Sequence, residues 1–118
     1  MRLLLADDNE MNVDLFTAAL AQHDVVVERD GAAALARALS EPFELLLLDV
    51  QMPLMRGDEV CRALRDKGVR TPILALTAAA MPDDIARARS AGFDAYLTKP
   101  ISPESLRAAV RQHARPAA

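Results

Sequence analysis

Short apolar segments alternate with longer segments of mixed polarity along the chain. The apolar segments are RLLLA, VVVE, ELLLLD, PILALT and DAYLTK, at residues 2–6, 25–28, 44–49, 72–77 and 94–99. They are too short for helices and lack the strict alternation of a half-exposed strand, and the last is the weakest of the five. Runs of this kind are typical of strands that are covered on both faces. The hydrophobic pattern therefore predicts five buried strands.

The segments that follow the predicted strands carry helix start and stop signals. They cover residues 9–23, 30–41, 57–68, 81–92 and 102–114. Gly68 and Gly92 are typical of helix ends, and Pro82 and Pro103, with acidic residues close behind, are typical of first turns. A β-α order repeated five times predicts an α/β protein. Its doubly wound parallel sheet would have five helices, because each right-handed crossover needs a helix.

The composition fits one domain over residues 1–118. The chain is 52% hydrophobic, enough to bury a core. No apolar segment approaches the roughly 20 residues that cross a bilayer, which favours the cytoplasm and no membrane contact. A formal net charge of −3, with scattered arginines, argues against direct nucleic-acid binding. The single cysteine, Cys61, lies in a helical pattern, where we expect a buried hydrophobe without chemistry.

Polar side chains follow or end four of the predicted strands. Asp7 and Asp8 follow the first, Asp49 ends the third, Thr77 ends the fourth and Lys99 ends the fifth. Ligands of open α/β sheets bind outside the carboxyl ends of the strands. These five side chains are therefore expected to converge on one edge of the sheet.

Each of these side chains also has an ordinary alternative role. Asp8 or Asn9 could cap the following helix, since short polar side chains accept hydrogen bonds from its first N–H groups. Asp49 could be a turn residue, Thr77 a helix cap and Lys99 a solvated charge. Their coincidence at one sheet edge favours a functional site over these separate roles.

Three neighbouring carboxylates repel one another, so the predicted cluster needs a cation. An all-oxygen set without His or thiolate suits Mg²⁺ better than zinc. Neighbouring residues of a strand point to opposite faces, so Asp8 is expected to bind the ion directly and Asp7 through water. Asp49 is the candidate nucleophile that would form an aspartyl phosphate. Lys99 would supply positive charge, and Thr77 a hydrogen-bond donor, to the phosphoryl oxygens.

The motifs around these residues resemble the receiver domains of two-component response regulators. They are DDNEMN at 7–12, LLLLDVQMPLMRG at 45–57, ALTA at 75–78 and YLTKPIS at 96–102. The resemblance is closest in style to single-domain or hybrid-kinase receivers. It implies the flavodoxin-like, chemotaxis-regulator-like fold with strand order 2-1-3-4-5. One departure is Arg56, where many members carry an acid, and we expect it to affect only local ion pairs.

The resemblance implies roles for individual residues at the predicted site. Asp49 would accept a phosphoryl group from a phosphohistidine of a histidine kinase or a histidine phosphotransfer protein. The implied Mg²⁺ ligands are Asp7, Asp8, Asp49 and the backbone carbonyl of Gln51. Lys99 would pair with the phosphoryl group, and the bond from Lys99 to Pro100 is expected to be cis.

The resemblance also implies a conformational switch. Thr77 and Tyr96 would move together after phosphorylation, although Tyr96 could instead only anchor the strand edge. Gln51 and Ala79 would flank the approach of an attacking water. We therefore expect these two residues to set the lifetime of the phosphorylated state.

The first predicted helix carries two apolar stripes. Val13, Phe16 and Leu20 share one side, and only one side can face the sheet. The second stripe could be covered by the last helix, or it could dock a helical partner that bears the donor histidine. The predicted docking residues are Met11, Leu15 and Ala18 from this stripe, with Pro100 and Ile101 nearby.

Three other functions are compatible with parts of the pattern. A small Mg²⁺-dependent phosphohydrolase would carry a D-x-D pair after the first strand, whereas Asp7 and Asp8 are adjacent. A flavin or nucleotide binder would need a glycine-rich loop there, which the sequence lacks. A receiver used only as an unphosphorylated scaffold would not need Asp49, Thr77 and Lys99 together.

We therefore expect a regulatory phosphoacceptor that catalyses only its own phosphorylation and dephosphorylation and is otherwise no enzyme. Its output would be contact with a downstream protein target, and we expect a monomer before phosphorylation.

Overall fold

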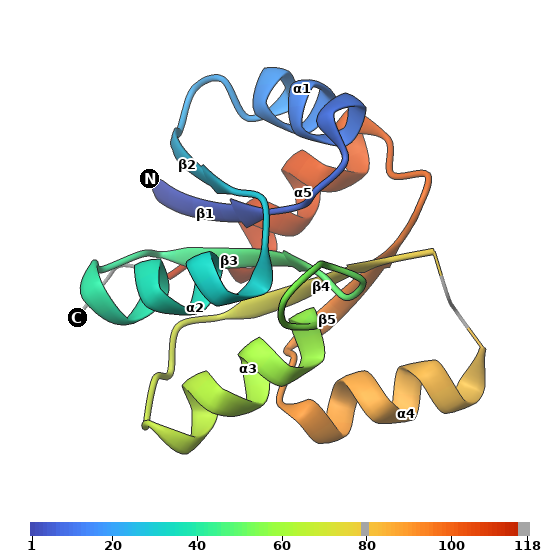
Figure 1. The fold of residues 1–118 in the computed structure, drawn as a ribbon. Coiled ribbons are helices and arrows are strands. Elements are labelled where there is room, and N and C mark those ends of the chain that lie inside the picture. The colour runs from blue at the N-terminus through green and yellow to red at the C-terminus, as the bar shows by residue number, and fades with distance from the viewer. Residues whose placement is uncertain (79–80, 116–118) are drawn as a thin grey trace.

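Five parallel strands form one sheet with helices on both faces (Figure 1). In this computed structural model, residues 1–78 and 81–115 are described. The elements are β1 (Arg2–Ala6), α1 (Glu10–Ala19), β2 (Asp24–Glu28), α2 (Gly31–Ser40), β3 (Leu45–Asp49), α3 (Gly57–Asp66), β4 (Ile73–Thr77), α4 (Pro82–Ala91), β5 (Ala95–Thr98) and α5 (Pro103–His113). The strand order is β2-β1-β3-β4-β5, and every pair is parallel. The predicted fold class and strand order are confirmed.

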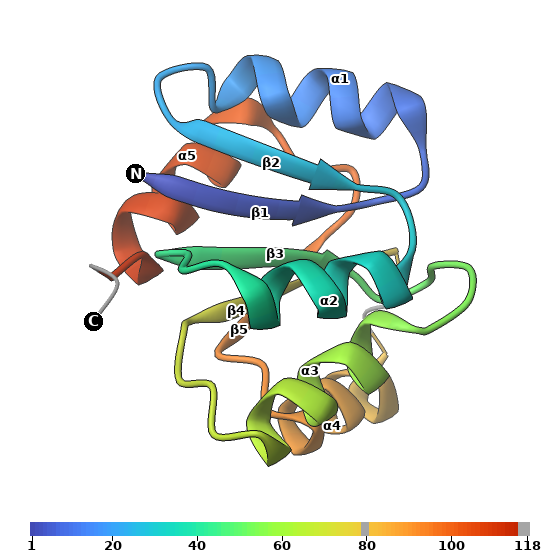
Figure 2. The same ribbon diagram turned by 60° about the vertical axis from the view of Figure 1, so that its left-hand side comes forward.

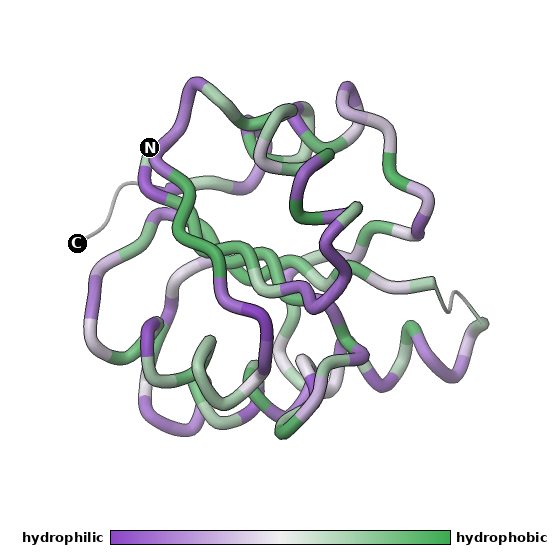
Figure 3. Tube along the Cα trace, turned by 45° about the horizontal axis from the view of Figure 1, so that its top comes forward, coloured by the Kyte–Doolittle hydropathy of each residue, from purple (hydrophilic) through white to green (hydrophobic). Residues whose placement is uncertain are grey.

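Alternate side chains of the strands enter two separate hydrophobic cores. Leu3 and Leu5 pack beneath α1 and α5, whereas Leu4 and Ala6 pack beneath α2 and α3. Figures 1 and 2 show α1 and α5 on one face of the sheet and α2, α3 and α4 on the other. Burial on both faces explains why the strands lack alternation. Hydrophobic residues accordingly concentrate in the central strands (Figure 3).

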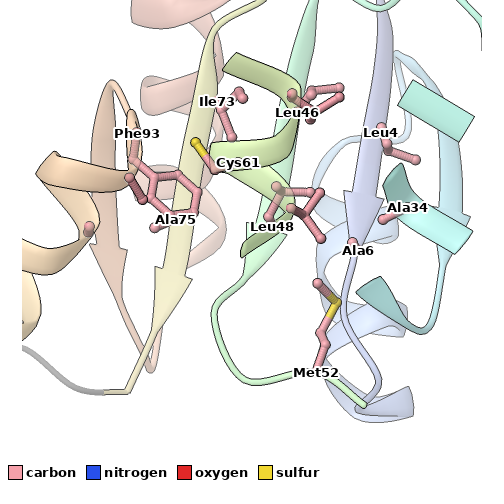
Figure 4. Packing of buried hydrophobic residues seen from close by; sticks show 14 of the residues in the cluster. Leu4, Ala6, Ala34, Leu46, Leu48, Met52, Cys61, Ile73, Ala75 and Phe93 are labelled. Carbon is pink, nitrogen blue, oxygen red and sulfur yellow. The ribbon is translucent and has the colours of Figure 1, made fainter. Parts of the chain in front are cut away.

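The core beneath α2 and α3 reaches the carboxyl edge of the sheet (Figure 4). Cys61 of α3 is fully buried in it, and burial raises the pKa of its thiol to about 11. At neutral pH Cys61 therefore behaves as the small hydrophobe that was predicted. Met52, in the loop after β3, is 8% exposed and ties this loop to the core.

The helix boundaries follow the predicted signals with one clear exception. Pro82 and Pro103 occupy first turns, and Gly92 ends α4 with a φ of +105°. The first helix, however, ends at Ala19 and not near His23. The chain must turn early because β2 begins at residue 24, opposite Arg2 of β1. In the described part of the chain, no helix combines the length and apolar character needed to cross a bilayer.

Candidate functional site

The end of β1 places two aspartates differently. Asp7 is fully buried, and its Oδ1 accepts a hydrogen bond from the N–H of Asn9 at 2.9 Å. The side chain of Asn9 in turn caps α1 by accepting from the N–H of Asn12 at 3.1 Å. Asn9 is therefore the cap, and the alternative role of Asp8 as a helix cap is wrong. Asp8 remains exposed at the edge of the sheet.

The three predicted aspartates form one cluster. Carboxylate oxygens of Asp7, Asp8 and Asp49 all lie within 4.8 Å of one another. They meet because β1 and β3 are adjacent strands, with Ala6 opposite Leu48. Asp49 is 7% exposed, so the cluster lies half inside the protein. Its all-oxygen donor set suits a hard divalent cation such as Mg²⁺.

Lys99, which follows the edge strand β5, also reaches this cluster. Its Nζ donates to Oδ2 of Asp7 at 3.0 Å and to Oδ2 of Asp49 at 3.1 Å. The Lys99 side chain is only 18% exposed, so the alternative role as a solvated charge is wrong. One ammonium cannot neutralise two buried carboxylates and the neighbouring Asp8. The site therefore keeps an excess of negative charge, which favours a bound cation.

The pKa values of this group reflect burial and pairing. Burial raises the pKa of Asp49, and the hydrogen bond and charge of Lys99 offset only part of that rise. Burial also works against the charge of Lys99, but its hydrogen bonds to Asp7 and Asp49 and the negative charges of both together outweigh this, so the pKa of Lys99 is raised. At neutral pH Lys99 remains a cation beside the acceptor position.

Two further predicted residues lie on the same edge. The N–H of Gln51 donates to Oδ1 of Asp49 at 3.1 Å, so Asp49 also has the predicted role in a turn. Thr77 ends β4, next to β3, and is 9% exposed. The cap of α4 is Met81, so the alternative role of Thr77 as that cap is wrong. Ala79 lies outside the described residues.

The match to a known family covers nearly the whole chain. A model of the response regulator receiver domain matches residues 3–111. The chain belongs to this family. This receiver domain is a component of two-component signalling, and its relatives include a transcriptional regulatory protein and a hybrid signal transduction histidine kinase.

Two relatives of the receiver domain are much longer than this chain. It is 38% identical over 112 residues to the alkaline phosphatase synthesis transcriptional regulatory protein PhoP of Bacillus subtilis, covering 93% of this chain and 47% of PhoP. It is 33% identical over 120 residues to hybrid signal transduction histidine kinase G of Dictyostelium discoideum, covering 96% of this chain and 4% of the kinase. The receiver domain thus spans about half or less of the length of these two relatives.

A solved structure shares both the fold and part of the sequence. The crystal structure is that of the receiver domain of sensor histidine kinase PA1611 from Pseudomonas aeruginosa, with a magnesium ion coordinated in its active site cleft. It matches the present receiver domain with a TM-score of 0.88 and 30% identity, covering 95% of each chain. The resemblance inferred from the motifs is therefore confirmed at the level of family and fold.

A cavity of about 130 Å³ lies beside the cluster of this receiver domain. Thr77 and Tyr96 both line it, together with Gln51, and α4 supplies part of its wall through Ile85 and Ala88. Tyr96 is half-buried and packs against the core beneath α2 and α3. It therefore anchors the strand edge and also borders a space into which a side chain could move.

The predicted docking residues of the receiver domain lie on its surface. Met11 is 74% and Leu15 is 58% exposed, and Ala18 and Pro100 are exposed too. Cover by α5 therefore does not explain the second stripe of α1, because α5 packs against the opposite side. Ile101 is half-buried against the core beneath α1 and α5. The bond between residues 99 and 100 is cis, as predicted.

Two glycines that shape the site were underestimated from the sequence. A Cβ on Gly57 would lie 2.2 Å from the carbonyl oxygen of Asp49, and one on Gly31 would lie 1.8 Å from that of Met55. From the sequence, Gly57 and Gly31 are predicted only as residues at the start of two helical segments, 57–68 and 30–41. The D-G pair at 30–31 was the available signal for the second. Arg56 pairs with Asp58 at 3.1 Å, a local effect as predicted.

The pKa of Asp49 itself is a testable property of the metal-free receiver domain. It is expected to lie above that of an ordinary aspartate, because burial outweighs the effect of Lys99. Lys99→Met should raise it further. The measurement is a carboxyl ¹³C NMR titration of the metal-free protein in EDTA. A midpoint for Asp49 at or below that of an aspartate in an unstructured peptide would contradict the raised pKa.

Proposed function

We propose that Asp49 is the phosphoacceptor of this receiver domain and that Mg²⁺ is its cofactor. The observation that carries the proposal is the Nζ of Lys99, which bridges Asp7 and Asp49 beside a third carboxylate. Asp7, Asp8, Asp49 and the backbone carbonyl of Gln51 would hold the ion. Bound Mg²⁺ would supply positive charge to the transferring phosphoryl group.

The residues of the chain itself account for the remaining requirements of phosphoryl transfer. A carboxylate oxygen of Asp49 attacks the phosphorus of a phosphohistidine, the P–N bond breaks, and the imidazole nitrogen leaves with the bonding electron pair. The Gln51 N–H holds one Asp49 oxygen and so limits rotation of the carboxylate. Lys99 stays beside the product and pairs with its oxygens, and Thr77 donates to one of them.

The proposal is tested by intact mass after incubation with acetyl phosphate. A gain of one phosphoryl group is expected with Mg²⁺ and none in EDTA. Asp49→Asn should gain no mass. Its matched control is Asp66→Asn, at an exposed position of α3, which should gain one phosphoryl group as the native chain does. The absence of any gain with Mg²⁺ would favour an unphosphorylated scaffold instead.

A histidine kinase or a histidine phosphotransfer protein is the proposed donor, docked through α1. Leu15→Asp is expected to slow transfer from this donor by about tenfold, since a charge would replace an apolar contact. Labelling by acetyl phosphate should be unchanged. The measurement compares both initial rates with those of Leu39→Asp, a leucine on α2 that is 44% exposed. Equal loss of both rates in Leu15→Asp would point to misfolding and contradict docking.

Thr77 and Tyr96 are the proposed switch. The shared cavity supports this, because Tyr96 could enter it once Thr77 moves toward the phosphoryl oxygens. Binding of beryllofluoride with Mg²⁺ is therefore expected to shift backbone amide NMR signals of α4, β4 and β5. Shifts confined to the loop after Asp49 would rule the switch out. Gln51 and Ala79 remain the residues proposed to set the lifetime of the phosphorylated state.

We extend the proposal to the wider setting of the protein. Residues 1–118 would form one receiver domain that acts in the cytoplasm and is a monomer before phosphorylation. It would pass its signal to a downstream protein target. No direct role with nucleic acid or membrane is proposed, and no turnover of other substrates. A generic aryl phosphate that was hydrolysed repeatedly would favour the phosphohydrolase alternative.

A further inference from the structure

Leu54 lies at the tip of an unfavourable turn and faces solvent. It is 84% exposed, more than any other large hydrophobic side chain in the described ranges. Its φ of +69° lies in the left-handed region, where the Cβ of a leucine clashes with its own backbone. The N–H of Met55 donates to the carbonyl of Pro53 at 2.8 Å and closes a three-residue turn around Leu54. Turns of this size with a positive central φ are rare and strained.

Neighbouring glycines fix this turn in place. The N–H of Gly31 donates to the carbonyl of Pro53 at 3.2 Å, and the Cα of Gly31 packs against the carbonyl of Met55. At the far end of the loop, the N–H of Gly57 donates to the carbonyl of Val50 at 2.9 Å. The loop is therefore held on both sides of Leu54.

Folding alone gives no reason for a leucine at this position. A side chain that stays in water gains almost no hydrophobic stabilisation. Glycine or asparagine would adopt the same φ with less strain. Strained residues persist where the surrounding structure fixes them, and they are concentrated at functional sites. An exposed, strained and apolar Leu54 therefore points to a binding role.

The place of the loop indicates what Leu54 binds. It follows β3, which ends in Asp49, and Figure 2 shows it projecting beyond the carboxyl ends of the strands. The Asp49 side chain is only 10% exposed, so a donor must press against this edge to reach it. Met11 and Leu15 are exposed on α1, which follows the neighbouring strand β1. Apolar side chains thus flank the acceptor on two sides.

We propose that Leu54 inserts into an apolar surface of the helical, histidine-bearing phosphodonor. This inference rests on the proposed role of Asp49 as acceptor. The fixed turn holds Leu54 in its binding position before the donor arrives, so little conformational freedom is lost on docking.

The test separates docking from chemistry and from folding. Each kinase of a purified panel is first autophosphorylated on its histidine with radiolabelled ATP. The probe is the kinase that transfers its phosphoryl group to the native chain fastest. Leu54→Gly and Leu54→Asn are expected to slow transfer from this kinase at least tenfold. Their labelling by acetyl phosphate should equal that of the native chain, and their melting temperatures should not fall. Leu54→Met, which keeps an apolar side chain, should restore most of the transfer rate.

Matched controls make each outcome decisive. Leu39→Asn changes an exposed leucine far from the acceptor and should transfer at the native rate. Transfer at the native rate in Leu54→Asn would overturn the inference. Lower melting temperatures with loss of both labelling reactions would also overturn it, because Leu54 would then serve folding. Failure of the proposed function is a different result, since acetyl phosphate would then fail to label even the native chain.

Discussion

Asp49→Asn is expected to abolish phosphorylation and, in metal-free buffer at pH 7, to raise the free energy of unfolding. An amide cannot act as the nucleophile, so no mass gain should follow incubation with acetyl phosphate. The stabilisation arises because Asp7 and Asp49 share one cation, Lys99, in a largely buried site. Asparagine keeps the shape of the side chain and leaves a balanced pair of Asp7 and Lys99. We expect a gain of about 1 kcal/mol, or about 4 °C in melting temperature.

The sign of this effect follows from the raised pKa of Asp49. Because the folded state binds the proton more tightly than the unfolded state, the stabilising contribution of Asp49 is present at acid pH. It is lost as the pH rises through the folded-state pKa. At pH 7 the charged form therefore destabilises the fold, and the advantage of the asparagine variant should shrink as the pH is lowered.

Urea unfolding at pH 7 and at pH 4.5, in EDTA, measures this difference. Asp66→Asn controls for loss of a surface carboxylate and should change little. A lower free energy of unfolding for Asp49→Asn at pH 7 would show that the charged acceptor stabilises the native state. Retained phosphorylation would place the acceptor elsewhere.

Gly57→Ala is expected to cost roughly 3 kcal/mol of stability and to slow labelling by about 100-fold. The added Cβ would lie 2.2 Å from the carbonyl oxygen of Asp49 and 3.0 Å from the Cα of Val50. Both neighbours are backbone atoms at the end of a buried strand, so neither can rotate away. The clash would have to displace Asp49 relative to Lys99, and phosphoryl transfer is sensitive to such displacements.

Gly68→Ala is the matched control for this substitution. Gly68 has a φ of +83°, but a Cβ at this position would meet no atom within 4 Å, so alanine there should cost about 1 kcal/mol through the backbone alone. Its labelling rate should equal that of the native chain. The two measurements are urea unfolding and the initial rate of mass gain with acetyl phosphate. Equal behaviour of the two alanine variants would mean that the backbone at Asp49 adapts without harm.

Much of the fold was predictable because the decisive signals are local. The runs of Leu, Val and Ile predict buried strands. Pro82 and Pro103 predict where two helices begin, and Gly68 and Gly92 predict where two helices end, each to within one turn. The end of α1 was not predictable in this way, since the pairing of Arg2 with residue 24 decides it. This pairing joins β1 to β2, and the register between two strands that are separated in the sequence cannot be derived from local patterns.

The acidic residues of the site were likewise visible in the sequence, but their differences were not. Asp7 and Asp8 are adjacent, yet Asp7 is buried and bonded to Lys99 while Asp8 is exposed. The alternation of side chains along a strand predicts that Asp7 and Asp8 point in opposite directions. It does not predict which of the two carboxylates lies next to the ammonium of Lys99.

The sequence by itself determined that this protein is an α/β receiver domain with three aspartates, a threonine and a lysine at strand ends. Only the tertiary structure decided that Lys99 reaches Asp7 across 92 residues, that Gly57 must lack a side chain, and that Leu54 is held in solvent at a positive φ. The reason is physical. Hydrophobic periodicity and helix capping act over a few neighbouring residues, whereas buried charge pairs and close backbone contacts form only when the strands align.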